Sequence, residues 1–135
     1  MVTRDPAARL ALARTVGLAD VHGAWWPRGR VLEREVVGLF LAWPPEEGLI
    51  CRVDYWPPDW TDAPVAVAVP GRRGPLRLGH LSARHPHRVV LRLLDGQRRL
   101  LSLVPSTAPL AVGVRRLDAI RRPPPDPHAP RRMDR

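Results

Sequence analysis

The clearest helical pattern in the chain is "RVLEREVVGLFLAW", residues 30–43. Its apolar residues recur at spacings of three and four positions, while charged residues take much of the other face. Two prolines follow at positions 44 and 45, and a helix does not continue through them. The pattern therefore predicts an amphipathic helix over 30–43. Its apolar stripe consists of Leu32, Val36, Leu39, Phe40 and Trp43.

Alternating apolar and polar residues predict strands through the middle of the chain. In "LICRVDYW", residues 49–56, alternation places Cys51, Val53 and Tyr55 on one face of a strand. Arg52, Asp54 and Trp56 then lie on the opposite face. In "VAVAV" the three valines share a face, and "GRRG" at 71–74 is a turn signal. Further strands are predicted over 65–69, 75–81, 87–94 and 98–104.

The last two of these strands flank "DGQ", and Asp-Gly is a strong signal for a β-hairpin. A loop of only two residues would place Arg92 directly opposite Arg99. Like charges at directly opposed positions destabilise a sheet. We therefore expect a longer or bulged turn.

The two ends of the body are less regular. Residues 9–16, "RLALARTV", suit a strand or a short helix. Residues 108–120 predict a second helix, with Leu110, Val114, Leu117 and Ile120 roughly on one stripe. Together these elements predict an α+β fold: an antiparallel sheet of about five strands with two packed helices, in a single domain.

Composition divides the chain into a body and two ends. We expect a frayed terminus over 1–8, one domain over 9–120, and a disordered tail rich in proline and arginine over 121–135. The single cysteine, Cys51, suits a reducing compartment, and no apolar run approaches the ~20 residues of a membrane helix. We therefore expect a cytoplasmic protein without a membrane partner. The sequence does not indicate its oligomeric state.

The net charge is +9, and every basic residue other than histidine is arginine. Lysine and asparagine are absent, and isoleucine is rare. These scarce residues have AT-rich codons, so a GC-rich genome explains part of the arginine content. The remaining positive charge favours an acidic partner, which can be a nucleic acid or a protein.

All seven aromatic residues lie between positions 25 and 60, which predicts one aromatic cluster. The adjacent residues Trp25 and Trp26 point in opposite directions if the backbone is extended, and Pro27 favours that conformation. We therefore expect one of the two rings to be structural and the other to be partly exposed beside arginine. The same argument separates Tyr55 from Trp56.

These features lead to a hypothesis of a small non-enzymatic binding module with an aromatic-arginine surface. An exposed tryptophan beside arginine can stack on single-stranded nucleic acid or form a contact for an acidic protein. The residues expected to form this surface are Trp25, Trp26, Arg28, Arg30, Arg52, Tyr55, Trp56 and Trp60.

The alternative is a small enzyme with an acid-base site beside the aromatic cluster. Its candidate groups are Asp20, His22, Asp54 and Asp59. A deep pocket that holds two of these groups would favour the enzyme, whereas a shallow basic surface would favour binding.

No metal or cofactor is expected. His80, His85 and His87 lack the spacing of a zinc site and suit a solvated loop. Glycine-rich phosphate-binding motifs are absent. Cys51 lies on a predicted strand and suits a small buried apolar residue.

Three segments also resemble an uncharacterised actinobacterial family that carries a G-A-W-W-P-R segment. They are "DVHGAWWPRGRVLEREVVGLF", "RVDYWPPDW" and "GRRGPLRLGHLSARHPHRVVLRLLDGQRRLLSLVP". The likeness covers roughly residues 10–120 and departs from the family at His22 and Gly29. The resemblance implies one soluble domain from a GC-rich bacterium, in a family of unknown function. It implies no activity.

The composition of residues 121–135 generates a first prediction. If this tail does not pack on the body, truncation after Ile120 leaves the melting temperature within about two degrees of the full chain. Thermal unfolding of both chains, followed by circular dichroism, measures the difference. A larger fall would show that the tail docks on the domain.

Overall fold

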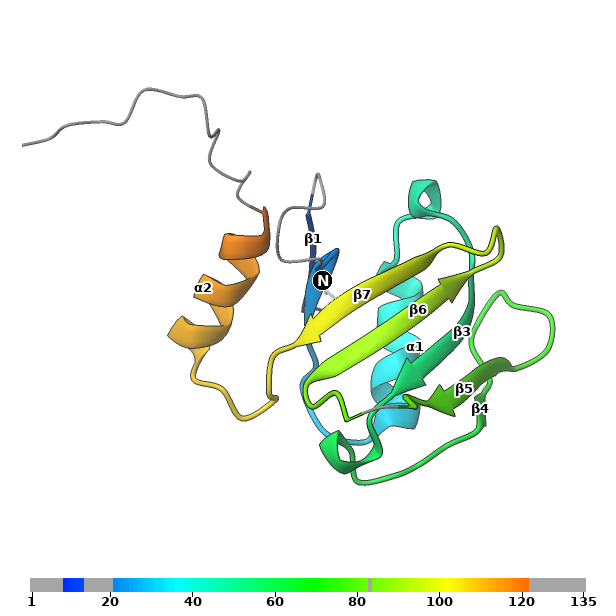
Figure 1. The fold of residues 1–135 in the computed structure, drawn as a ribbon, viewed down its shortest axis with the longest axis horizontal. Coiled ribbons are helices and arrows are strands. Elements are labelled where there is room, and N and C mark those ends of the chain that lie inside the picture. The colour runs from blue at the N-terminus through cyan, green and yellow to red at the C-terminus, as the bar shows by residue number, and fades with distance from the viewer. Residues whose placement is uncertain (1–8, 14–20, 83, 122–135) are drawn as a thin grey trace, which may run out of the picture.

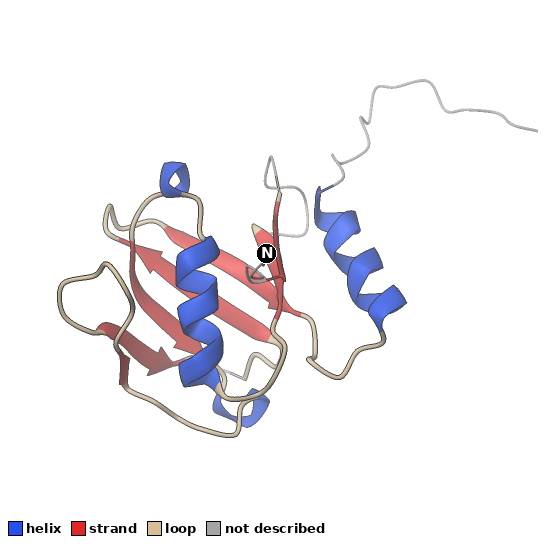
Figure 2. Ribbon diagram, turned by 180° about the vertical axis from the view of Figure 1, so that it is seen from behind, coloured by secondary structure: helices blue, strands red, loops and turns tan. Residues whose placement is uncertain are grey.

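The computed structural model describes residues 9–13, 21–82 and 84–121. These residues form one sheet of seven strands and two α-helices (Figures 1 and 2). Of the predicted ends, residues 1–8 and 122–135 lie outside the described residues, whereas Arg121, the first residue of the predicted tail, is the last residue of the second helix. The strands are β1 (Arg9–Leu12), β2 (Gly23–Trp26), β3 (Ile50–Tyr55), β4 (Ala66–Val67), β5 (Leu76–His80), β6 (Arg88–Leu93) and β7 (Arg98–Leu103). The helices are α1 (Leu32–Ala42) and α2 (Leu110–Arg121), with short 3-10 turns at Pro45–Glu47 and Pro57–Asp59.

The strand order is β1-β2-β7-β6-β3-β5-β4. The α+β class is confirmed, but the expected antiparallel sheet of about five strands is wrong. The sheet is mixed, because β2 pairs with β7 in parallel and β3 pairs with β5 in parallel. Alternation could not reveal β2, because all four of its residues, "GAWW", are buried.

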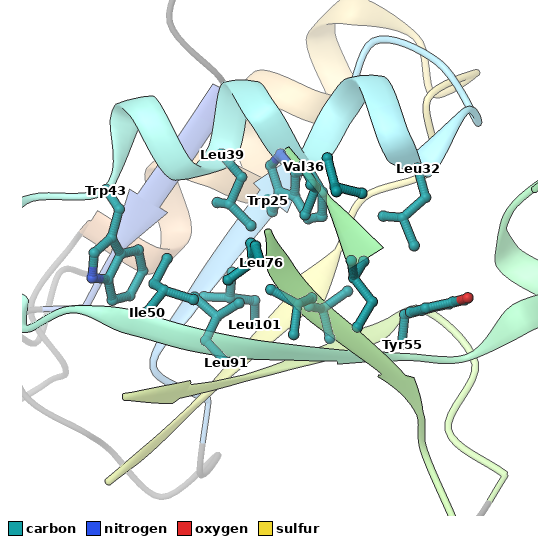
Figure 3. Close-up of a cluster of buried hydrophobic side chains, with 14 of the residues drawn as sticks. Trp25, Leu32, Val36, Leu39, Trp43, Ile50, Tyr55, Leu76, Leu91 and Leu101 are labelled. Carbon is teal, nitrogen blue, oxygen red and sulfur yellow. The ribbon is translucent and has the colours of Figure 1, made fainter. Parts of the chain in front are cut away.

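One face of the sheet is covered by α1 (Figure 2). The predicted apolar stripe is confirmed for Leu32, Val36, Leu39 and Trp43, which are buried, whereas Phe40 is only partly buried. Figure 3 shows Leu32, Val36, Leu39 and Trp43 of the helix facing residues of the sheet, among them Trp25 of β2 and Tyr55 of β3. This main core lies between α1 and the sheet.

The start of α1 is capped by a residue from a distant part of the chain. The cap position, Val31, offers no side-chain hydrogen bond. The Asp62 carboxylate instead accepts hydrogen bonds from the backbone N–H groups of Leu32, at 2.6 Å, and Glu33, at 3.0 Å. It thereby satisfies two of the donors that a helix leaves free at its start.

The second helix, α2, covers only one end of the other face. It packs on β1 and β2, where its Gly113 and Leu117 are buried with Trp26. The predicted stripe is therefore wrong in part: Leu117 is buried, but Leu110 and Val114 are exposed. The flat ring of Trp26 needs a residue without a side chain opposite it, and Gly113 supplies one.

The hairpin between β6 and β7 has the longer turn that was expected. The Leu93 N–H donates to the Gln97 carbonyl at 2.9 Å, and Gly96 adopts a left-handed conformation with φ 92°. Three residues, 94–96, therefore form the turn. We expected the longer turn to avoid a pair of directly opposed arginines, and this reason was wrong. The turn places Arg92 directly opposite Arg98 and so creates another like-charged pair.

The bulge in β3 changes one predicted face. The two steps of β3 from Ile50 to Arg52 oppose a single step of β6, from Leu93 to Arg92, so Cys51 is the extra residue. Ile50 is buried in the core, and Cys51 is only half-buried. The expectation that Cys51 is buried was therefore wrong. Arg52 and Asp54 still share the face opposite the core.

The contact between α2 and Trp26 generates a second prediction. Glycine to alanine within a helix ordinarily stabilises by about 1 kcal/mol. A Cβ on Gly113 would overlap carbon atoms of the Trp26 ring, and overpacking typically costs about 1–3 kcal/mol. We expect Gly113→Ala to lower the free energy of unfolding by about 1 kcal/mol, measured by urea denaturation.

The matched control is Gly29→Ala. The nearest heavy atom to a Cβ there is Glu35 Oε2, at 3.5 Å, which is an ordinary contact. This control is expected to leave stability nearly unchanged. If Gly113→Ala stabilised the protein instead, the packing of α2 on Trp26 would be refuted.

Candidate anion-binding face

Within the described part of the chain, no helix lies over much of the second face of the sheet. Figure 1 looks onto this face, with α1 behind the strands and α2 to one side. Strands β7, β6, β3 and β5 are uncovered here. Side chains alternate along β6, so Val89 and Leu91 point into the core while Arg88, Val90 and Arg92 point to the uncovered face.

Four arginines form a straight row across these four strands. Arg77 of β5 is the register partner of Arg52 of β3, Arg52 is the partner of Arg92 of β6, and Arg92 is the partner of Arg98 of β7. Register partners point to the same face. Neighbouring strands lie ~4.8 Å apart, so the row is about 14 Å long. We call these four residues the arginine row.

One buried carboxylate lies beside the row. Asp54 is 5% exposed and accepts hydrogen bonds from Arg52 Nε at 2.7 Å and from Arg92 Nε at 3.0 Å. Each guanidinium binds a different oxygen of Asp54. Among the described residues that line this face, Asp54 is the only acidic one. The row therefore keeps a net positive charge.

The uncovered face is hollowed into an open cleft of about 750 Å³. Arg88 adds a further positive charge to the cleft, and His80 and His85 come from β5 and the loop after it. Val90 and Leu100 give the cleft apolar surface. On the side of β2 it is bounded by His22, whose Nδ1 accepts a hydrogen bond from the Leu100 N–H at 3.0 Å.

The tryptophan pair lies elsewhere. Trp25 is 0% exposed and Trp26 is 2% exposed, so the expectation that one ring reaches solvent is wrong. The two rings do point to opposite faces of β2, but each face is covered. The Trp25 ring lies 5.5 Å from the Trp60 ring in the main core. Trp26 lies on the other face, beneath Gly113 and with the Arg9 guanidinium 3.7 Å from its ring centre.

The expected single aromatic cluster is therefore not formed, because the sheet itself separates Trp26 from Trp25 and Trp60. Tyr55 is buried in the main core, and Trp56 is half-buried, as the alternation argument required of that pair. The Arg84 guanidinium lies 6.0 Å from the Trp56 ring centre.

Two predicted arginines stabilise loops rather than the cleft. Arg30 donates from Nε to the Asp59 carbonyl and from Nη2 to the Pro58 carbonyl, each at 3.1 Å. The exposed Arg28 donates its backbone N–H to Glu35 Oε1 at 3.0 Å. Of the residues predicted to form the binding surface, only Arg52 lines the cleft.

The candidate acid-base groups are divided between two places. Asp20 lies outside the described residues. His22 and Asp54 line the same cleft, but His22 Nδ1 and both Asp54 oxygens already accept hydrogen bonds. Asp59 lines a smaller pocket of about 240 Å³, where its carboxylate accepts the backbone N–H of His87 at 2.8 Å. The Nδ1 of His87 lies 3.4 Å from the other oxygen of Asp59.

The histidines near the cleft do not group as metal ligands. His80 and His85 line the cleft, while His87 turns to Asp59. Within 9–13, 21–82 and 84–121, no three His, Cys, Asp or Glu side chains are placed to hold one ion.

The sequence interpretation missed most of the cleft. It named Arg52 but not Arg88, Arg92 and Arg98 of the cleft, and it did not name Arg77 of the arginine row. Alternation along β6 could have assigned Arg88 and Arg92 to a face opposite the core. The row itself could not have been found, because it depends on the registers of three strand pairs.

The fold and this face together define a small α+β domain with one uncovered, positively charged face of its sheet. The chain belongs to a family of unknown function (DUF5994), whose model matches residues 9–120. No curated protein and no solved structure matches it. Neither helix of the described chain has the length and apolar character needed to cross a membrane.

Tyr55 generates a third prediction, because it is the only tyrosine in the chain. Burial raises the pKa of its hydroxyl above the ordinary 10.0, and the Asp62 carboxylate raises the pKa further. The hydroxyl donates to the Pro64 carbonyl at 3.0 Å. Ultraviolet absorbance of tyrosinate during an alkaline titration should therefore show ionisation above pH 10 in the folded protein.

The same shift gives the protein a pH-dependent stability. A group with a raised folded pKa contributes stability that is fully present below its unfolded pKa and is lost as the pH rises through the folded pKa. The free energy of unfolding should fall above about pH 10, and less steeply in Tyr55→Phe. Equal slopes in both proteins would contradict this.

Proposed function

We propose that the protein is a non-enzymatic binding module whose uncovered sheet face holds single-stranded nucleic acid by its phosphates. The observation that carries this proposal is the arginine row. Like charges at opposed positions destabilise a sheet, and this sheet contains three such contacts in succession. A partner with a line of negative charges would relieve the repulsion.

The charge of this face is largely uncompensated within the domain. Among the described residues, Arg77, Arg88 and Arg98 take part in no ion pair. Guanidinium groups match the geometry of phosphate oxygens and bind them through two parallel hydrogen bonds. A GC-rich genome raises the arginine content everywhere, but it does not account for four arginines in register on one face.

The buried tryptophans change the mode of binding. The hypothesis drawn from the sequence relied on base stacking, and neither Trp25 nor Trp26 can reach a base. Val90 and Leu100 offer apolar contacts within the cleft, and Trp56 is the half-buried aromatic residue at the end of β3. Contacts to phosphate carry little sequence information. The proposed module therefore binds with weak sequence preference and strong dependence on salt.

The alternative of a small enzyme is favoured by one observation, the Asp59–His87 pair. His87 has a φ of 59°, which is unusual for a residue other than glycine and is often found at functional sites. A carboxylate beside Nδ1 can orient a histidine so that Nε2 acts as a base. Ser106 and Thr107 line the same pocket.

The proposed function is tested with a fluorescently labelled single-stranded oligonucleotide of mixed sequence. Anisotropy titrations over a series of salt concentrations measure the affinity and its salt dependence. We expect binding at low salt, with log affinity falling linearly as log salt rises. In Arg88→Gln/Arg98→Gln, the affinity should fall, and the slope should decrease by roughly 0.7 for each phosphate that the protein no longer neutralises.

Arg34→Gln is the matched control, because Arg34 is exposed on α1, which covers the opposite face of the sheet (Figure 2). It removes the same charge per residue and should leave the affinity nearly unchanged. No binding at low salt would refute the nucleic-acid proposal. Binding that weakens equally in the control would assign the affinity to overall charge rather than to this face. An acidic protein would then become the partner to test.

A further inference from the structure

Within the arginine row, Arg52 and Arg92 differ from their neighbours because a buried carboxylate holds both of them. Their Nε atoms donate to separate oxygens of Asp54, at 2.7 and 3.0 Å. Their side chains are 41% and 48% exposed, whereas the side chain of Asp54 is 7% exposed. The Asp54 carboxylate is therefore buried beneath the two guanidinium groups, and these groups reach solvent.

Each of these guanidinium groups keeps its terminal nitrogens for another ligand. Among the described residues, the Nη1 and Nη2 atoms of Arg52 and Arg92 donate to no acceptor. An arginine fixed through Nε presents these two nitrogens as a planar fork. Two forks fixed by one carboxylate therefore lie side by side on neighbouring strands.

Gly79 leaves the space that this arrangement requires. It is the register partner of Asp54 on β5. A Cβ on Gly79 would overlap the Arg52 guanidinium and would lie 2.8 Å from Asp54 Oδ1. The Arg52 side chain can lie over β5 only because this position has no side chain.

We propose that Arg52 and Arg92, positioned by Asp54, form a clamp for a single phosphate group of the bound nucleic acid. This inference rests on the proposed function and names the point at which the ligand is held. Ordering a free arginine on binding carries an entropic cost, and Asp54 fixes both side chains before the ligand arrives. Asp54 is thus a positioning residue, and the two arginines contact the ligand.

The phosphate can come from two parts of a nucleic acid. A terminal phosphate monoester carries up to two negative charges, which is more than the net charge of +1 of Arg52, Arg92 and Asp54 together. An internal phosphodiester carries one negative charge, and such groups recur along the strand. Oligonucleotides with and without a terminal phosphate distinguish these sources.

Asp54→Asn tests the clamp, because charge and positioning predict opposite results. The substitution removes a negative charge from a basic face, so simple electrostatic attraction would tighten oligonucleotide binding. Without the positioned forks, binding would weaken, and we expect the affinity to fall about tenfold. Glu46→Gln, which removes an exposed carboxylate outside the cleft, is the control and should not weaken binding.

Circular dichroism checks that Asp54→Asn folds, and a second pair of variants keeps the test independent of that substitution. Arg92→Lys retains the charge but removes the fork, whereas Arg98→Lys makes the same change at an arginine that Asp54 does not hold. The clamp predicts a clear fall in affinity for Arg92→Lys and a much smaller fall for Arg98→Lys.

The outcomes separate the two proposals. If the unchanged protein binds but Asp54→Asn binds equally or more tightly, and the two lysine variants behave alike, the clamp is refuted and the binding face stands. If the unchanged protein binds no oligonucleotide at low salt, both proposals fail. A weakening in Asp54→Asn that is confined to the terminally phosphorylated strand supports the clamp and assigns it to the monoester. An equal weakening for both strands supports the clamp and assigns it to the backbone.

Discussion

Trp25 and Trp26 point to opposite faces of β2, and both rings are buried because a different helix covers each face. Each ring removes ~150–250 Å² from water, so the two together account for a large part of the hydrophobic stabilisation at this end of the sheet. Their indole N–H groups donate to no acceptor among the described residues, which makes the burial costly as well. The arrangement requires α1 over Trp25 and α2 over Trp26.

The position of α2 decides which part of the sheet stays open. Because α2 lies over β1 and β2, it does not extend over β6, β3 and β5 (Figure 1). Its Arg116 donates to Ser102 Oγ of β7 at 3.1 Å, so the edge of the helix reaches the first uncovered strand. The burial of Trp26 and the exposure of the arginine row are therefore two consequences of one packing arrangement.

The arginines on the open face repel one another, and this repulsion is only partly compensated. Repulsion along the arginine row is offset at its centre by Asp54, whose burial is tolerated because both oxygens are hydrogen-bonded. Such departures from the usual rules of strand pairing are expected at functional sites. The proposed anion-binding role of this face rests on them.

Local sequence patterns were sufficient to predict the elements that depend on residues close together in the chain. The apolar stripe and the following prolines located α1, and Asp95-Gly96 located the hairpin between β6 and β7. By contrast, the cap of α1 could not be predicted, because Asp62 is about thirty residues from the N–H groups that it binds. The partner of Asp59 was also missed, because His87 is separated from it by 28 positions.

By itself, the sequence determined the α+β class, the amphipathic helix α1, the alternation that separates Arg52 and Asp54 from the core, and the opposed directions of Trp25 and Trp26. These follow from the periods of helices and strands, which neighbouring residues set. Only the tertiary structure decided that both tryptophans are buried, that two strand pairs are parallel, and that four arginines share one row. These depend on strand order, register and helix placement, which arise from contacts between residues far apart in the chain.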